Sequence, residues 1–332
     1  GPAAAACADF VKGVHARLRQ ELRDALEAAE AAGAAPLTDA ARARVEREVW
    51  GAHLQRAARL EEYARAMDAL ATQVWEHSPA SEPMLEGNAR CSAGSDAIEN
   101  RYDWVHSACQ AWFFGSGAAS GMQAVLAKEA RARQFQHGLP AGAPGGGCEG
   151  PGPELPDSWA RPLRLLDVGS NNNFLGRHGE RFGCLFDVVA MDIAPAHESV
   201  VRGDFLELPV ASGAEAAPGA WPAATFDVVL FSLLLSYMPT TRMRYRCCRQ
   251  ARRLLKRHGL LIVFDPDSRG HHRSVQWMKD WRAAIEGLGF RRWRYRKALH
   301  MHCLAFRAVD EPACAEGDGD HALMRIPQDD PA

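Results

Sequence analysis

Short apolar runs alternate with helical patterns between residues 160 and 309, and this alternation constrains the fold more than any other feature of the chain. Six of the runs have the length of buried strands; they cover residues 163–168, 186–191, 226–232, 259–264, 290–296 and 302–308. Strands that alternate with helices predict a mostly parallel sheet covered by helices. The last two runs follow each other without a helix between them, so an antiparallel strand is expected at the end of the sheet.

Two helices in this half of the chain are predicted from residue spacing and from glycines. One covers residues 240–259 and is expected to end at Gly259, because glycine commonly follows the last turn of a helix. The other covers residues 274–290 and is expected to stop at Gly289. Together with the strands, these helices predict an α/β domain over residues 160–309.

The turn after the first predicted strand has few glycines for a nucleotide-binding fold. Residues 165–176 read LLDVGSNNNFLG, so Gly169 stands alone and is followed by Ser170 and three asparagines. A dinucleotide carries a pyrophosphate, which requires several glycines and a helix N-terminus. S-adenosylmethionine has no phosphate, so one glycine can suffice. Asparagine tolerates positive φ well, so the run can form the turn and offer amides to the methionine portion; a solvated turn is the plainer alternative.

Further polar residues lie at the edge of the predicted sheet where ligands of doubly wound folds bind. Asp192 ends the second predicted strand, as expected for an acid that accepts hydrogen bonds from ribose hydroxyls. Asp204, in GDFLEL, is expected to accept from the adenine amino group, while the backbone N–H of Phe205 meets a ring nitrogen. Ser232 ends the third predicted strand. An acid alone after a strand is more often a helix cap or a surface residue, but together with Gly169 these residues predict an adenosine site.

Residues 3–138 are predicted to form an all-α N-terminal domain. Apolar residues recur there at three- and four-residue spacing, Thr38 or Asp39 can cap a helix, and no convincing strand is found. Residues 139–159 are rich in proline and glycine and are interpreted as a flexible linker. Residues 310–332 are acidic and lack a pattern, so a disordered tail is predicted.

The composition excludes several classes of protein. The chain has 332 residues, of which 47% are hydrophobic and 24% charged, as in globular proteins. A net charge of −2 gives no overall attraction to nucleic acid. The nine cysteines show no metal-ligand spacing, which indicates a reduced intracellular protein without a metal site. No apolar run is long enough to span a membrane, so we expect a cytoplasmic protein.

Several stretches of the chain together resemble one protein family. They are VKGVHARLRQ, LEEYARAMDALATQVW, RLLDVGS, MDIAPAHESV, GDFLEL, VVLFSLLLSYMP, DPDS, WRAAIEGLGF and HMHCLAFR. The family contains the fungal 25S ribosomal-RNA adenine-N1 methyltransferase and, in animals, S-adenosylmethionine sensors upstream of mTOR complex one. The resemblance covers nearly all of residues 8–309, and residues 171–187 and 211–223 depart from the family pattern. It implies a class I S-adenosylmethionine-dependent methyltransferase (Rossmann-like) domain preceded by an all-α domain.

The resemblance also implies a ligand, partners and one more site residue. S-adenosylmethionine is the expected ligand, with S-adenosylhomocysteine as a competing ligand. The ligand-free protein is expected to bind the GATOR and KICSTOR complexes and to inhibit mTOR complex one signalling, and the ligand is expected to release them. Recruitment to the lysosomal surface would occur through these partners. Arg101 matches a family arginine that reaches from the helical domain to the ligand carboxylate, which a guanidinium pairs well; a solvated helix face is the ordinary alternative.

No catalytic group is evident in the sequence. Many amino-methylating enzymes carry an Asn/Asp-Pro-Pro-aromatic tetrad after the fourth strand, where this chain reads SLLLSYMP over residues 232–239. Five nearby residues are candidate catalytic groups: Tyr237, Asp265, Asp267, His300 and His302. Each can also be explained structurally, as a residue at the edge of the core, in a turn or on the surface of a strand. The arginines of residues 242–253 suit an RNA-binding face, but equally a solvated face or one that meets an acidic protein.

Three hypotheses about function remain. The favoured one is a sensor that responds to S-adenosylmethionine, because no catalytic clamp is found and because of the resemblance to the animal branch. The alternative is an S-adenosylmethionine-dependent RNA (adenine-N1) methyltransferase, and a scaffold with vestigial ligand binding is a third. No catalytic residue is assigned.

Overall fold

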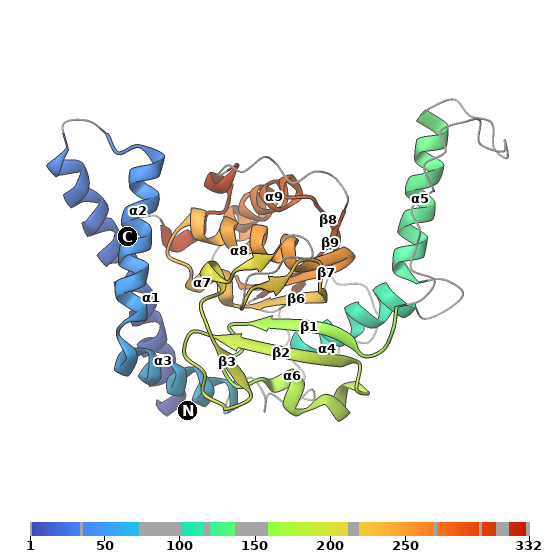
Figure 1. Ribbon diagram of the computed structural model, residues 1–332, viewed down its shortest axis with the longest axis horizontal. Coiled ribbons are helices and arrows are strands. Elements are labelled where there is room, and N and C mark those ends of the chain that lie inside the picture. Colours follow the sequence, from blue (N-terminus) through green and yellow to red (C-terminus); the bar gives the residue numbers. More distant parts are fainter. Residues whose placement is uncertain are drawn as a thin grey trace.

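A central sheet with helices on both faces makes up most of the molecule, and a layer of N-terminal helices stands at one end of it (Figure 1). The computed structural model describes residues 2–33, 36–72, 101–115, 120–136, 159–211, 219–267, 271–298, 301–309 and 319–329. Within these residues, no helix has both the length and the apolar composition needed to cross a membrane.

The central sheet has seven strands in the order β3-β2-β1-β6-β7-β9-β8. Their bounds are Leu163–Val168 (β1), Phe186–Asp192 (β2), Val200–Arg202 (β3), Phe226–Ser232 (β6), Leu255–Pro266 (β7), Phe290–Ala298 (β8) and Met301–Ala308 (β9). Neighbouring strands from β3 to β7 pair in parallel, whereas β9 is antiparallel to both β7 and β8. This order, with one reversed strand beside the edge, is that of the class I methyltransferase fold, and the prediction of that fold is confirmed.

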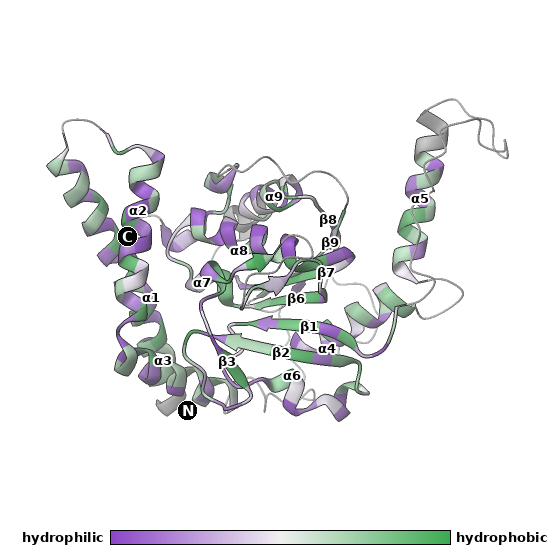
Figure 2. Cartoon of the chain, viewed as in Figure 1, coloured by the Kyte–Doolittle hydropathy of each residue, from purple (hydrophilic) through white to green (hydrophobic). Residues whose placement is uncertain are grey.

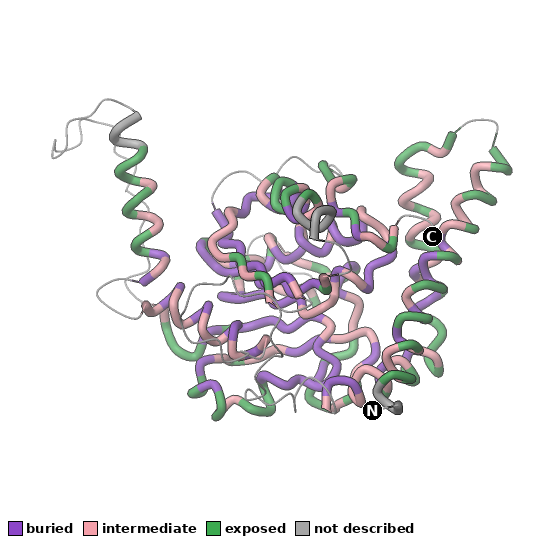
Figure 3. Tube along the Cα trace, turned by 180° about the vertical axis from the view of Figure 1, so that it is seen from behind, coloured by how far each residue is buried: buried purple, intermediate pink, exposed green. Residues whose placement is uncertain are grey.

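Both faces of the sheet are buried, as the nearly continuous apolar runs of its strands require (Figures 2 and 3). One face packs on α8 (Thr241–Leu254) and α9 (His271–Gly287), whose Trp281 is fully buried. The other face packs on α4 (Arg101–Cys109) and the π-helical turn η2 (Gln110–Phe114). Trp104 of α4 is 1% exposed and lies against Phe264 of β7, so these helices belong to the α/β layers.

Shorter elements connect these layers. They are α5 (Gly121–Gln136), α6 (Phe174–Arg177), η3 (Gly179–Phe182), η4 (Phe205–Glu207), the small sheet of β4 (Val210–Ala211) and β5 (Trp221–Pro222), and α7 (Leu234–Tyr237). Helix α5 projects away from the sheet at the end opposite the N-terminal helices (Figure 1).

Three helices form the N-terminal layer: α1 (Pro2–Ala32), α2 (Asp39–Leu54) and α3 (Ala57–Leu70). The side-chain oxygen of Thr38 caps α2 by accepting a hydrogen bond from the backbone N–H of Ala41 at 3.2 Å, as predicted. Leu18 of α1 and Trp50 of α2 are buried in the same core as α8 and α9. The layer therefore packs against the α/β half of the chain and does not stand apart from it.

The predicted helix end at Gly259 is wrong. Helix α8 ends at Leu254 and β7 begins at Leu255, so Gly259 lies inside a strand. A Cβ atom on Gly259 would lie 2.9 Å from the carbonyl oxygen of Asp227 in β6, while the preceding residue, His258, has a φ of 62°. This glycine permits a close approach between two strands at an irregular point of β7.

The prediction of a disordered tail is wrong for residues 319–329. These residues form two short 3₁₀ turns, η5 (His321–Leu323) and η6 (Pro327–Asp329), and Met324 between them is fully buried. Arg244 of α8, itself fully buried, donates to both carboxylate oxygens of Asp329 at 2.6 and 2.7 Å. An acidic, unpatterned sequence is therefore ordered by one buried ion pair and by apolar contacts. The remainder of the tail, and the predicted linker apart from Trp159, lie outside the described residues.

Candidate ligand-binding site

A pocket opens at the carboxyl ends of β1 and β6, where the strand order of the sheet reverses and where such sheets bind their ligands. Its volume is about 360 Å³, which includes space open to solvent. We call it the ligand pocket; its lining is Met67, Ala71, Arg101, Tyr102, Asp167, Gly169, Ser170, Asn171, Asn172, Ser232 and Leu233. Three of the six predicted site residues, Arg101, Gly169 and Ser232, line it.

The turn after β1 forms one wall of the pocket and has the geometry that its composition predicts. Gly169 has a φ of 75°, and a Cβ atom there would lie 3.2 Å from the side chain of Leu234. Asn171 and Asn173 both have a φ of 55°, in the left-handed region. The asparagines therefore supply the positive φ angles that glycines supply in other nucleotide-binding turns, and the side chain of Asn173 caps α6.

Asp167 is a buried acid in the pocket wall that the sequence analysis did not assign to the site. Its Oδ2 accepts from the hydroxyl of Ser170 at 2.8 Å, while its Oδ1 has no hydrogen-bond partner among the described residues. Burial raises its pKa to about 6, against the lowering effects of Ser170 and Arg101. An acid inside an apolar strand, two positions before Gly169, is a signal that the sequence did contain.

Ser232 adds a second unsatisfied polar atom to the same wall. Its hydroxyl oxygen is buried without a hydrogen-bond partner among the described residues. Buried polar atoms are nearly always paired in native structures. Ser232 and Asp167 therefore offer a ligand one hydroxyl and one carboxylate oxygen within a single pocket.

The opposite wall comes from the N-terminal region. Arg101 is the first residue of α4, and its guanidinium lies over the ring of Tyr102, 4.8 Å from the ring centroid. Its Nη2 also donates to the Tyr102 hydroxyl at 3.0 Å. Met67 and Ala71 reach the pocket from the end of α3. The wall thus combines one cation with apolar side chains.

Asp192 lies at the end of β2, as predicted, but outside the pocket lining. Its carboxylate accepts from the backbone N–H groups of Asn171 at 2.9 Å and Ala194 at 2.8 Å, so it holds the turn after β1 in place. Burial raises its pKa to about 6, although these hydrogen bonds lower it. Helix α3 covers this position, because Leu60 and Ala64 pack against Ala194.

Asp204 and Phe205 also lie outside the pocket lining. One oxygen of Asp204 accepts from the backbone N–H of Leu206 at 2.9 Å, and the other accepts from the indole N–H of Trp50 in α2 at 2.8 Å. Phe205 is 4% exposed and its ring lies edge-on to Phe231. The indole of Trp50, in the helical layer, therefore donates to the carboxylate that was predicted to accept from the adenine amino group.

An aromatic cluster fills the space between the helical layer and Asp192 and Asp204. It consists of His15, Trp50, His53, Tyr63 and Tyr237, whose rings contact one another. His53 hydrogen-bonds the Tyr237 hydroxyl at 2.5 Å, and His15 that of Tyr63 at 3.0 Å. Burial lowers the pKa of His15 to about 3 and that of His53 to about 4, so both rings are neutral near pH 7. Burial raises the pKa of Tyr237, which makes this candidate unsuited to act as an ionised base.

The other candidate catalytic residues lie away from the ligand pocket. Asp265, Asp267 and His302 line a separate pocket on the α9 side of the sheet. His300 lies outside the described residues.

The arginines of α8 are engaged in the fold. Arg242 and Arg244 are buried, Arg246 pairs with Glu207 at 3.0 Å, and Arg252 and Arg253 donate to backbone carbonyl oxygens. These five side chains hold neighbouring segments together, and of the five only Arg253 is exposed, so they do not form a continuous basic face for RNA.

Sequence comparison with named proteins shows the family of this chain. The sequence profile of a family described as 25S rRNA (adenine(2142)-N(1))-methyltransferase, Bmt2, matches residues 152–308. A Danio rerio protein named S-adenosylmethionine sensor upstream of mTORC1 is 33% identical over 304 residues, which cover 85% of this chain and 70% of that protein. The chain belongs to the family of this sensor. A Xenopus laevis member of the same name is 34% identical over 275 residues, 78% of this chain, and the match spans 63% of the length of that relative.

Solved methyltransferase structures match the α/β half of this family member at lower similarity. A Burkholderia thailandensis 1,6-didemethyltoxoflavin-N1-methyltransferase with bound S-adenosylhomocysteine is 18% identical, with a TM-score of 0.31, and covers 45% of this chain and 72% of its own. The antibiotic-resistance methyltransferase Kmr is also 18% identical, with a TM-score of 0.31, and covers 44% of this chain and 86% of its own. At these scores the likeness carries no argument, and the fold assignment rests on the strand order.

Proposed function

We propose that the ligand pocket binds S-adenosylmethionine and that the protein reports this binding to the mTORC1 pathway as a negative regulator. One observation carries the proposal: Met67, Ala71 and Arg101 line the same pocket as Gly169 and Ser232. A ligand in that position contacts the helical layer and the sheet at once, which is what a sensor requires. The Danio and Xenopus relatives are named S-adenosylmethionine sensor upstream of mTORC1, which supports both the proposed ligand and the proposed pathway.

The polar groups of the pocket suit the methionine end of the ligand. The unpartnered Oδ1 of Asp167 can accept from the α-ammonium, and the guanidinium of Arg101 can pair with the carboxylate across the pocket. Ser232 offers its hydroxyl nearby. Asp192 is proposed to accept from the ribose hydroxyls, and Asp204 and the N–H of Phe205 to meet adenine. S-adenosylhomocysteine shares all of these groups, so we expect it to compete.

The contact between Trp50 and Asp204 supports a coupling between ligand and helical layer. The indole N–H of Trp50 donates to the oxygen that the adenine amino group would use. A ligand shifts an equilibrium between two conformations only by its different affinity for each of them. We propose that the adenine competes with Trp50, displaces α2, and so changes the surface that partners recognise.

The partners proposed for the ligand-free form are the GATOR and KICSTOR complexes, which the ligand would release. Binding would take place in the cytoplasm, with recruitment to the lysosomal surface through these complexes. The test is a pull-down of both complexes by the purified chain, with and without saturating S-adenosylmethionine. We expect capture without the ligand and release with it. Equal capture in both conditions, with ligand binding verified by calorimetry, would overturn the sensor proposal.

Methyl transfer to RNA adenine N1 is the second candidate function, favoured by the family profile that matches residues 152–308. The same purified chain, given S-adenosylmethionine labelled on the methyl group and ribosomal RNA, distinguishes the two. Transfer of label to adenine N1 would establish an enzyme. The sensor proposal expects ligand binding without such transfer.

A further inference from the structure

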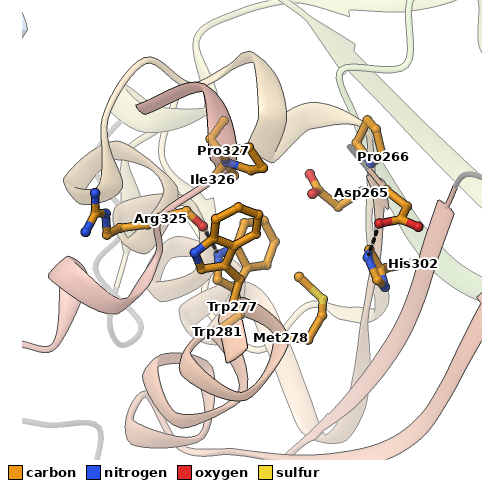
Figure 4. A pocket seen from close by; sticks show the side chains of 10 residues that line it. Asp265, Pro266, Trp277, Met278, Trp281, His302, Arg325, Ile326 and Pro327 are labelled. Carbon is orange, nitrogen blue, oxygen red and sulfur yellow. Dashed lines mark hydrogen bonds and ion pairs between the residues drawn. The ribbon is translucent and has the colours of Figure 1, made fainter. Parts of the chain in front are cut away.

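A second pocket lies at the carboxyl end of β7, and it shares no lining residue with the ligand pocket (Figure 4). We call it the α9 pocket, because α9 contributes one wall through Trp277, Met278 and Trp281; Asp265 and His302 stand opposite. Residues 325–327 of the ordered tail close one side. Its volume is about 260 Å³, which includes space open to solvent.

Asp265 is a polar residue of the α9 pocket that has, within the described part of the chain, an unsatisfied hydrogen-bond acceptor. The residue is 5% exposed, and its Oδ1 has no hydrogen-bond partner among the described residues. Figure 4 shows its carboxylate turned toward the open space. The nearby cations have other partners, since Arg244 donates to Asp329 and Arg19 to the carbonyl oxygen of Ser236. A buried acceptor without a donor is costly, and a ligand that donates a hydrogen bond would remove that cost.

The aromatic wall faces Asp265 across the pocket. The indole N–H of Trp281 donates to the carbonyl oxygen of Arg325 at 2.8 Å, which fixes the ring. The side chain of Arg325 itself points away from the pocket (Figure 4). Trp277 stands beside Trp281 and is half-buried. Indole faces attract cations, tryptophan most strongly of the aromatic residues.

The lining carries charges of both signs, and burial raises the pKa of Asp265 to about 7, so its carboxyl is partly ionised near pH 7. Asp267 pairs with Lys297 at 2.6 Å and lies 3.4 Å from His302. Burial lowers the pKa of His302, so its ring is neutral near pH 7. The described residues contain no group of three or more side chains placed to hold a metal ion. An organic cation with hydrogen-bond donors fits this combination better than a metal or an anion does.

We propose that the α9 pocket binds an arginine side chain of a partner protein. A planar guanidinium can stack on an indole and donate in the same plane to a carboxylate, which a lysine ammonium cannot do. The proposal does not depend on S-adenosylmethionine binding at the other pocket.

The test uses three fluorescently labelled pentapeptides with the sequence Gly-Gly-X-Gly-Gly and the intact chain. X is arginine, lysine or citrulline, which is the uncharged isostere of arginine, and binding is followed by fluorescence polarisation. We expect the arginine peptide to bind at least about tenfold more tightly than the citrulline peptide, the loss expected when a charge-assisted hydrogen bond is removed. Equal binding of the two peptides, or no saturation up to about 10 mM arginine peptide, would overturn the proposal.

Variants of the chain locate the binding. Asp265→Asn and, separately, Trp277→Ala are each expected to reduce arginine-peptide affinity about tenfold or more. Asp280→Asn removes a carboxylate of α9 outside the pocket lining and should leave the affinity unchanged. Trp277 is half-buried, so its variant keeps the test valid if Asp265→Asn fails to fold. Unchanged affinity in a folded Trp277→Ala variant contradicts the site.

Discussion

At the scale of single residues, the proposed site depends on carboxyl groups that the fold keeps out of water. Asp167 is 2% exposed, and Asp192 accepts two backbone N–H groups, yet each has a pKa raised to about 6 by burial. Such groups cost free energy when ionised, and they are common where a protein binds a polar ligand. The two residues differ in role, since Asp192 also holds the backbone turn and Asp167 leaves an oxygen open to the pocket.

Asp167→Asn is expected to weaken S-adenosylmethionine binding about tenfold or more, because the ligand ammonium loses a charged acceptor. The melting temperature should not fall, since the substitution removes a buried charge and keeps the volume. Isothermal calorimetry measures the first quantity and thermal denaturation the second. Asp187→Asn, an exposed position of β2, is the matched control. Unchanged affinity would remove Asp167 from the site.

Ligand affinity is expected to fall as the pH is lowered through about 6, because Asp167 and Asp192 then take up protons and lose their charge. Their contribution to stability runs the other way. Because both pKa values are raised above the ordinary value near 4, this contribution is fully present below about pH 4 and is lost as the pH rises through 6. Calorimetric titrations at about pH 5 and about pH 7.5 test the first expectation. Asp167→Asn should show a smaller pH dependence than the wild type.

At the scale of elements, two short contacts decide where whole segments lie. Trp50 joins α2 to the sheet through Asp204, and Asp329 joins the tail to α8 through Arg244. Both contacts connect segments more than 80 residues apart in the sequence. Loss of either contact is therefore expected to loosen a whole segment as well as one hydrogen bond or ion pair.

Trp50→Phe is expected to raise S-adenosylmethionine affinity several-fold, because phenylalanine keeps most of the apolar contact and cannot donate to Asp204. A neutral-to-charged hydrogen bond is worth about 1.5–3 kcal/mol, part of which is offset by the apolar volume lost. Calorimetry at fixed pH gives the change. Weaker binding in a variant of unchanged melting temperature would show that Trp50 supports the ligand site and does not compete for it.

Asp329→Ala is expected to destabilise the chain by about 2–4 kcal/mol, because Arg244 would remain buried without its counter-ion. Three backbone carbonyl oxygens still accept from Arg244, which limits the loss. Denaturant unfolding measures the difference against Asp320→Ala, an exposed position of the same segment without a side-chain cap. Equal stability of the two variants would mean that the tail contributes nothing to the fold in solution.

At the scale of the whole molecule, the helical layer rests on the sheet edge that carries the ligand pocket. Arg19 donates to the carbonyl oxygen of Ser236, His53 bonds Tyr237, and Asn172 donates to Asp68 at 3.1 Å. The layer also shares the apolar core of the sheet, in which Leu18 and Trp50 are buried. A ligand that displaces Trp50 would therefore change the packing of the layer on the sheet.

Arg101→Ala is expected to lower ligand affinity modestly while largely uncoupling ligand binding from partner release. Arg101 opens α4, which packs on the sheet, and it lines the pocket together with Met67 and Ala71 of the helical layer. A ligand held by Arg101 would therefore be fixed against that layer, and its effect on partners would depend on this contact. The measurement combines calorimetry, to verify saturation, with pull-down of GATOR and KICSTOR. Complete release of both complexes by the saturated variant would show that another residue couples the two events.

The sequence by itself determined the parts that depend on local patterns. The apolar runs predicted six of the seven strands of the central sheet, because a strand buried on both faces needs an apolar residue at nearly every position. The short strand β3 was missed, because three residues are too few to show a pattern. The asparagine run predicted a turn with positive φ, and the structure has two such residues there. Residue type and place identified Thr38 and Asp39 as the two candidate caps of α2, and Thr38 is the cap in the structure.

Only the tertiary structure decided which side chains meet. Residues 101–114 pack against the sheet, Trp50 reaches Asp204, the acidic tail is ordered by Arg244, and β7 begins before Gly259. Of the six predicted site residues, Arg101, Gly169 and Ser232 line the pocket and the other three lie outside its lining. The physical reason is that periodicity and turn chemistry act over a few residues, whereas these contacts join distant segments whose approach depends on the packing of the whole core.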